Sequence, residues 1–258
     1  MLSRLFRKPS PNTDVPLPPR KLVRAVGGGD FAAIGEEFFP YFTDLARLQP
    51  HESVLDIGCG CGRMAVPLTL HLNASGSYDG FDIQTPGIRW CRKNVTPRYP
   101  NFRFQVADVY NKKYNPKGQH QPGEYRFPYD DDSFDFVFLT SVFTHMLRAD
   151  MEHYVDEIVR VMRPTGRCLI TCFLLNDESR ALIKDDKSTL TFDYVVEHTA
   201  VHRTSVPEAA VAFDEMAMIE VLEDRDLTID KPIRYGSWCG REDYLSYQDI
   251  LLARPTRA

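Results

Sequence analysis

The sequence predicts an α/β protein built around a mostly parallel sheet, and three observations predict it. Residues 53–57 form a short apolar run typical of a strand buried on both faces, and three alternating glycines follow it. Two further short runs, 77–83 and 102–106, end at or just before an acidic residue. Helical patterns at 64–72 and 85–94 separate the three runs, so strands and helices alternate along the chain.

The composition is typical of a globular protein that handles small molecules or other proteins. The 258 residues are 43% hydrophobic and 26% charged, and the formal net charge is -5. This balance does not favour a nucleic acid as partner. No apolar run approaches the roughly 20 residues that a membrane span requires, so we expect none.

The six cysteines do not form the framework of a small secreted domain, and we therefore expect a cytoplasmic protein. Neither of the two close pairs has C-x-x-C spacing. The sequence therefore predicts no metal site.

Residues 1–30 differ in composition from the remainder of the chain. The first 24 residues carry six basic side chains against the single acid Asp14, together with five prolines. We interpret this segment as a flexible leader. Residues 31–258 are predicted to form one domain, with insertions at about 110–132 and 176–212.

The glycine-rich turn is the feature that points to a ligand. Gly58, Gly60 and Gly62 lack side chains, which lets backbone N–H groups approach a ligand closely. The spacing is G-x-G-x-G rather than the G-x-G-x-x-G of dinucleotide-binding proteins, and Asp56 precedes it. Residues 54–63, VLDIGCGCGR, resemble the first motif of the class I S-adenosylmethionine-dependent methyltransferases.

This resemblance covers about residues 31–255 and implies a Rossmann-like, doubly wound sheet. Seven strands are expected, mostly parallel, with a terminal antiparallel hairpin formed by 227–235 and 246–253.

The resemblance also assigns a site for S-adenosylmethionine. The turn faces the amino-acid tail of the cofactor, and Asp56 either orients the turn or meets the amino group. Asp82, at the end of the second strand, accepts hydrogen bonds from both ribose hydroxyls. Asp108 accepts from the adenine amino group beside the Val109 amide. The predicted cofactor residues are Asp56, Gly58, Cys59, Gly60, Gly62, Asp82, Ile83, Asp108, Val109, Thr140 and Ser141.

The acceptor side of the predicted site is less constrained. His145 follows the fourth strand, where several branches of the family carry a base, and a neutral imidazole can remove a proton from a hydroxyl or amine. Its alternative role is to cap a helix or pack over the cofactor. Loop 110–132, Trp238 and Arg241 are further candidates to face the acceptor.

We therefore predict a methyltransferase that acts on an O, N or C atom of a small molecule. One alternative is an aminopropyl transferase, although Thr140 and Ser141 stand where such enzymes carry acids. The other is a catalytically silent partner protein of the same fold, against which the intact acids and glycines weigh.

Overall fold

The computed structural model describes residues 14–196 and 199–256. The chain divides into two compact units, residues 1–107 and 108–258. Seven strands take the order β10-β11-β5-β4-β1-β2-β3 in a mostly parallel sheet that is antiparallel at the β10 and β11 end. This α/β arrangement, with its terminal antiparallel hairpin, confirms the predicted fold class.

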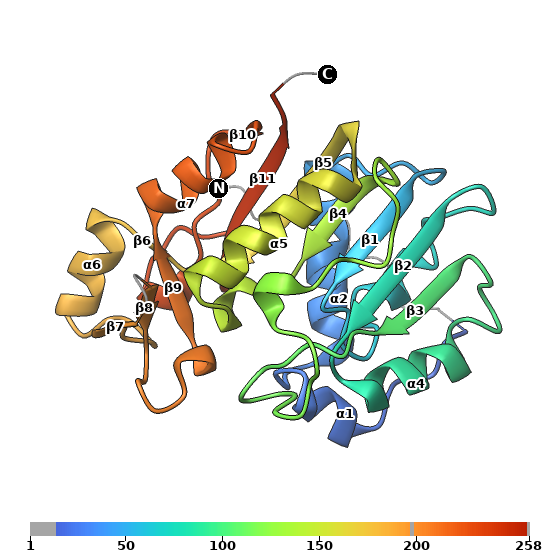
Figure 1. The fold of residues 1–258 in the computed structure, drawn as a ribbon, viewed down its shortest axis with the longest axis horizontal. Helices are drawn as coiled ribbons and strands as arrows, with labels where there is room; N and C mark the ends of the chain where they lie inside the picture. Colours follow the sequence, from blue (N-terminus) through green and yellow to red (C-terminus); the bar gives the residue numbers. More distant parts are fainter. Residues whose placement is uncertain (1–13, 197–198, 257–258) are drawn as a thin grey trace. The chain divides into compact units, whose positions relative to one another are not determined.

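The first unit alternates strands and helices (Figure 1). Strand β1 pairs in parallel with β2, and β2 pairs in parallel with β3. Its elements are α1 (Arg20–Ala25), α2 (Phe31–Pro40), the π-helix η1 (Tyr41–Leu45), β1 (Ser53–Ile57), α3 (Ala65–Leu68), β2 (Ser77–Asp82), α4 (Thr85–Asn94) and β3 (Phe102–Val106).

Burial explains why these short segments fold as they do. The last four residues of β1 and the last five of β2 are buried, as expected for strands covered on both faces. Helix α4 buries Ile88 and Cys91 on one face and ends in basic residues, which suit the carbonyl end of a helix. Helix α2 begins at the predicted cap, since Asp30 accepts hydrogen bonds from the N–H groups of Ala32 and Ala33.

Part of the predicted flexible leader is helical. Residues 1–13 lie outside the described residues, but Arg20–Ala25 form α1 directly after Pro19. The Pro19 carbonyl accepts from the N–H groups of Leu22 and Val23, and Val23 is buried. A buried side chain on a run of good helix formers stabilises a helix that composition alone did not indicate.

The second unit contributes β4, β5, β10 and β11 to the main sheet. Strand β4 (Phe134–Leu139) pairs in parallel with β5 (Met162–Cys172), and β5 pairs antiparallel with β11 (Asp249–Pro255). Strand β11 pairs antiparallel with β10 (Leu227–Ile229), which is the predicted hairpin with shorter strands. The helices are η2 (Pro122–Glu124), η3 (Phe143–His145), α5 (Arg148–Val161), α6 (Asp177–Lys184), η4 (Pro207–Ala209), α7 (Glu215–Glu223) and η5 (Ser237–Cys239).

A second sheet arises from the segment that the sequence predicts as an insertion. Its order is β6-β9-β8-β7, from β6 (Leu174–Leu175), β7 (Tyr194–Val196), β8 (Thr199–Val201) and β9 (Val211–Asp214). These strands have two to four residues each, too few for a readable alternation of polar and apolar side chains. The sequence therefore did not indicate this sheet.

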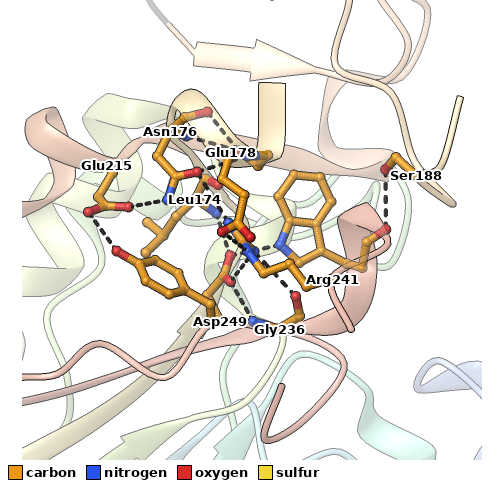
Figure 2. Close-up of polar contacts among 11 residues, drawn as sticks. Leu174, Asn176, Glu178, Ser188, Glu215, Gly236, Arg241 and Asp249 are labelled. Carbon is orange, nitrogen blue, oxygen red and sulfur yellow. Dashed lines mark hydrogen bonds and ion pairs between the residues drawn. The ribbon is translucent and has the colours of Figure 1, made fainter. Parts of the chain in front are cut away.

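A buried polar network anchors this second sheet (Figure 2). Asp249 is completely buried, and its carboxylate accepts from the N–H groups of Leu174 and Gly236 at 2.7 Å each. The Trp238 indole N–H donates to the same carboxylate at 2.8 Å, and Arg241 Nη1 lies 3.2 Å away. One carboxylate thus fixes the start of β6, the loop before η5 and the start of β11.

Within residues 14–196 and 199–256, no helix is both long enough and apolar enough to cross a membrane.

Candidate functional site

The glycine turn of the first unit adopts a backbone that demands glycine. Gly58, Gly60 and Gly62 have φ values of 77°, 57° and 81°. The N–H groups of Gly58 and Cys59 both donate to the Phe81 carbonyl, at 2.9 and 3.0 Å, which ties the turn to β2. A Cβ atom on Gly87 at the start of α4 would lie 2.5 Å from the Gly60 carbonyl oxygen. The turn is therefore held rigidly between β2 and α4.

Asp82 is bonded directly to this turn. Its Oδ2 accepts from the Gly60 N–H at 2.8 Å, and its Oδ1 accepts from the Gln84 N–H at 2.6 Å. Burial raises the pKa of Asp82, while the two backbone donors oppose that rise. Each carboxylate oxygen keeps a second lone pair after these bonds, which leaves acceptors for a diol. Ile83, between the two bonded residues, is half-buried.

Asp56 carries an unsatisfied buried oxygen. The Tyr78 hydroxyl donates to its Oδ2 at 2.5 Å, whereas Oδ1 is buried with no hydrogen-bond partner among the described residues. Burial raises the pKa of Asp56 to about 8, and the nearby Asp82 adds to the rise. An ammonium or N–H donor at Oδ1 would satisfy this oxygen and restore the charged form.

In the second unit, Asp108 and Val109 begin a loop folded back on itself. The Asp108 carbonyl accepts from the N–H groups of Gln119 and His120, at 3.0 Å each. Asn115 Nδ2 donates to the Val109 carbonyl at 2.9 Å and lies 3.4 Å from Asp108 Oδ1. The predicted adenine ligands thus lie on a backbone that this loop fixes.

The segment after β4 is held by a ring of hydrogen bonds. Thr140 is half-buried, and Ser141 has φ 61°. The Ser141 N–H donates to Thr171 Oγ1 at 2.8 Å, and Gln248 Nε2 donates to Ser141 Oγ at 2.8 Å. The ring closes with the Thr171 hydroxyl, which donates to Gln248 Oε1 at 2.6 Å. These bonds offset the strain of a left-handed serine.

His145 lies on η3 between two other segments of the second unit. Its Nδ1 is 2.8 Å from the Glu208 carbonyl oxygen, which can only accept, so in the neutral ring Nδ1 carries the proton. Its Nε2 then bears the lone pair and lies 3.4 Å from the Tyr114 hydroxyl. The pKa of His145 is lowered to about 4, chiefly by burial; the hydrogen bond to the Glu208 backbone opposes this fall, and the charge of Lys113 adds to it. The ring is therefore neutral at physiological pH.

Two predicted acceptor contacts are wrong. Trp238 is completely buried, packs against Phe173 and donates to Asp249, while Arg241 is 6% exposed and pairs with Glu178 and Asp249. Both side chains anchor the second sheet instead, because a buried carboxylate requires donors.

The part of the chain that the structure describes contains no group of three or more His, Cys, Asp or Glu side chains arranged to hold a metal ion.

Comparison with known proteins assigns the family. The family model for the methyltransferase domain matches residues 48–216, which include the glycine turn, Asp82 and His145. The chain belongs to this family. It is thereby placed among the class I S-adenosylmethionine-dependent methyltransferases, as the first motif predicts.

Curated relatives of this methyltransferase domain match over part of their length. Phthiotriol/phenolphthiotriol dimycocerosates methyltransferase of Mycobacterium tuberculosis is 32% identical over 118 residues, which are 45% of this chain and 35% of that protein. A probable cobalt-precorrin-6B C(15)-methyltransferase (decarboxylating) of Thermoplasma acidophilum is 33% identical over 101 residues, 38% of this chain and 41% of that one. The chain thus matches about a third to two fifths of the length of these relatives.

Solved structures share the fold of this methyltransferase domain. The PH0226 protein of Pyrococcus horikoshii has a TM-score of 0.60 at 17% identity, covering 89% of this chain and 93% of that chain. The 1,6-didemethyltoxoflavin-N1-methyltransferase of Burkholderia thailandensis, solved with 1,6-didemethyltoxoflavin and S-adenosylhomocysteine, has a TM-score of 0.54 at 18% identity, covering 94% and 93%.

Sequence reasoning missed residues that hold the predicted site residues in place. The Tyr78 hydroxyl donates a hydrogen bond to Asp56 from the adjacent strand. The Gln248 side chain donates a hydrogen bond to Ser141, which lies 107 residues earlier in the sequence. Parallel pairing of Val54 with Tyr78 is the signal that would have placed Tyr78 near Asp56. No local pattern in the sequence signals the Gln248 contact.

Proposed function

We propose that this protein transfers a methyl group from S-adenosylmethionine to an oxygen, nitrogen or carbon atom of a small molecule. The observation that carries the proposal is the glycine turn tied to the Asp82 carboxylate, within a chain of the methyltransferase domain family. Bound S-adenosylmethionine supplies an electrophilic methyl group whose leaving group is a neutral thioether.

The residues of the first unit fit this cofactor. The second lone pairs of the Asp82 oxygens suit the two ribose hydroxyls, and the unsatisfied Asp56 Oδ1 suits an ammonium group. Gly60 has a positive φ, which favours glycine, and because glycine has no side chain the backbone can approach the amino-acid tail. Asp108 is the proposed adenine ligand, and the segment Thr140–Ser141 the proposed neighbour of the sulfonium.

His145 is the proposed base on the acceptor side. In the neutral ring Nε2 bears the lone pair, which the Tyr114 hydroxyl approaches to 3.4 Å. An acceptor that displaces this long hydrogen bond can give Nε2 a proton from a hydroxyl or N–H group as the new bond to carbon forms. A base with a pKa of about 4 is weak, so it suits an acceptor that becomes strongly acidic during attack. Its other proposed role is to align the acceptor.

We also propose a cytoplasmic location. All six cysteines are free and buried, which is typical of a protein kept in a reducing compartment.

The cofactor assignment predicts the outcome of calorimetry with S-adenosylhomocysteine. We expect the wild-type protein to bind it, and we expect Asp82→Asn to weaken binding about tenfold or more, because an amide offers fewer acceptors to a diol. Asp224→Asn, at an exposed carboxylate, is the matched control and should bind as wild type does. Unchanged affinity in Asp82→Asn would remove the ribose assignment, and no binding by wild type would remove the enzyme proposals altogether.

The base assignment predicts a rate effect and a pH profile. With an acceptor identified by transfer of a labelled methyl group, His145→Ala should lower kcat about a hundredfold. This is the lower end of the rate enhancement that a general base contributes. The wild-type rate should hold on acidification to pH 5 and fall only near pH 4, where the imidazole becomes charged. His51→Ala, at an exposed histidine, is the control. A near-wild-type rate in His145→Ala would exclude a base at this position.

A further inference from the structure

Three segments of the second unit converge around His145. The helix η4 places the Glu208 carbonyl against His145 Nδ1, and loop 110–132 places the Tyr114 ring 5.1 Å from the imidazole centroid, edge to face. Lys112 Nζ donates to the Ser205 carbonyl at 2.9 Å, which joins this loop to the segment before η4. The side chain of Glu208 therefore belongs to a residue that is already bonded to the imidazole through its backbone.

Glu208 has an unsatisfied oxygen in this setting. Its Oε2 is shielded from water and has no hydrogen-bond partner among residues 14–196 and 199–256. Lys113 does not provide a donor, because its Nζ lies over the Tyr114 ring at 4.8 Å from the centroid. Glu208 is half-buried as a residue, but this one oxygen is shielded and has no donor. Such an oxygen costs free energy in the folded protein, and a donor that arrives with a ligand would recover it.

We propose that Glu208 binds a cationic nitrogen of the methyl acceptor. The proposal rests on the proposed methyltransferase function and narrows its acceptor to a class. A carboxylate forms its strongest hydrogen bonds with charged N–H donors, which are shorter and about twice as strong as neutral pairs.

Glu208 and His145 have different roles in this proposal. The imidazole is neutral and has its lone pair at Nε2, so it can accept a proton but cannot balance a positive charge. Glu208, whose own backbone carbonyl is bonded to that imidazole, can balance the charge. The acceptor nitrogen held by Glu208 is a recognition group, whether or not it is the atom methylated.

The first test asks which molecules receive the methyl group. Polar extracts of cells are separated on a cation exchanger, and each fraction is incubated with the full-length protein and methyl-labelled S-adenosylmethionine. We expect the label in the retained, cationic fraction. Label confined to the unretained fraction would overturn the proposal while leaving the methyltransferase function intact, and the absence of S-adenosylhomocysteine binding would instead overturn the function.

The second test measures the role of Glu208 itself. On the labelled acceptor, Glu208→Gln should raise KM at least about tenfold with a much smaller change in kcat, since it removes the charge but keeps the shape. Its affinity for S-adenosylhomocysteine should equal that of wild type. Glu242→Gln, at an exposed carboxylate, should change neither value.

Folding is followed in the same variants. Glu208→Leu removes the unsatisfied oxygen, so the variant protein should unfold at a temperature no lower than that of wild type. A change in its KM is then not caused by misfolding. A wild-type KM in a folded Glu208→Gln or Glu208→Leu variant would overturn the proposal.

Discussion

At the scale of single residues, buried carboxylates decide how the glycine turn is prepared for a ligand. Asp82 reaches the turn through the Gly60 N–H, while Asp56 keeps one oxygen without a donor among the described residues. Both groups have a raised pKa because burial disfavours their charged form. The protein is therefore less stable than it would be with neutral side chains here, and a ligand that donates to these oxygens recovers the difference.

The raised pKa of Asp56 makes the stability of the unliganded protein depend on pH. Its pKa is about 8 in the folded protein, against an ordinary value of 3.8 for an aspartate side chain, so the folded state binds the proton more tightly. This contribution to stability is complete below about pH 4 and is lost as the pH rises through about 8. Between those limits, we expect the free energy of unfolding to fall by on the order of 1 kcal/mol per pH unit because of this group.

Urea denaturation of the unliganded protein at pH 5, 6 and 7 measures the effect. Asp56→Asn removes the titrating group and keeps an acceptor for Tyr78, so its stability should depend less steeply on pH than that of wild type. Asp224→Asn serves as the control. Parallel pH dependences in wild type and Asp56→Asn would refute the raised pKa.

At the scale of elements, Asp249 connects three parts of the chain. Its carboxylate bonds the N–H groups of Leu174 and Gly236 and the indole of Trp238, and Arg241 balances its charge (Figure 2). The network extends to the start of α7, where Asn176 Nδ2 donates to Glu215 at 2.7 Å. The short strands of the second sheet therefore depend on Asp249, which lies in β11 of the main sheet.

Asp249→Asn should destabilise the protein by about 3 kcal/mol. The substitution leaves Arg241 without its buried counter-charge and turns an amide N–H₂ toward existing donors. Urea denaturation followed by tryptophan fluorescence reports it, because Trp238 is part of the network. Glu242→Gln provides the control, and a loss below about 1 kcal/mol would show that the network contributes little.

The elements also show how much of the fold can be predicted from the sequence. Residues 85–94 were predicted as a helix and form α4, because an amphipathic pattern repeats over ten residues. The short strands β6 to β9 escaped prediction, since long-range pairing rather than local pattern defines them. In the candidate site, the role of Asp82 is predicted from its position at the end of a strand. The contact between His145 and the Glu208 carbonyl joins residues 63 apart in the sequence, and no local pattern predicts it.

At the scale of the whole molecule, the cysteines share one property. All six are free and buried, and burial raises the pKa of their thiols, to about 11 for Cys61 and about 12 for Cys168. Since the thiolate is the reactive form, we expect hardly any reaction of the native protein with a disulfide reagent at about pH 8.

Denaturation in guanidinium should expose all six thiols to the same reagent. Counting the released chromophore before and after unfolding checks both statements. Rapid reaction of a native cysteine would contradict the burial, and fewer than six thiols after unfolding would reveal a disulfide.

The continuation of β5 into β6 has a consequence for how such proteins diversify. The chain leaves the main sheet at Cys172 and enters the second sheet at Leu174, whose N–H is bonded to Asp249. Residues 174–214 therefore form a unit that can be exchanged between relatives, joined to the chain after β5 and before α7. Glu208, the residue that we propose to hold the acceptor, lies in this segment. We therefore expect a chimaera that keeps Asp249 and its donors to take on the acceptor preference of the exchanged segment while the glycine turn stays unchanged.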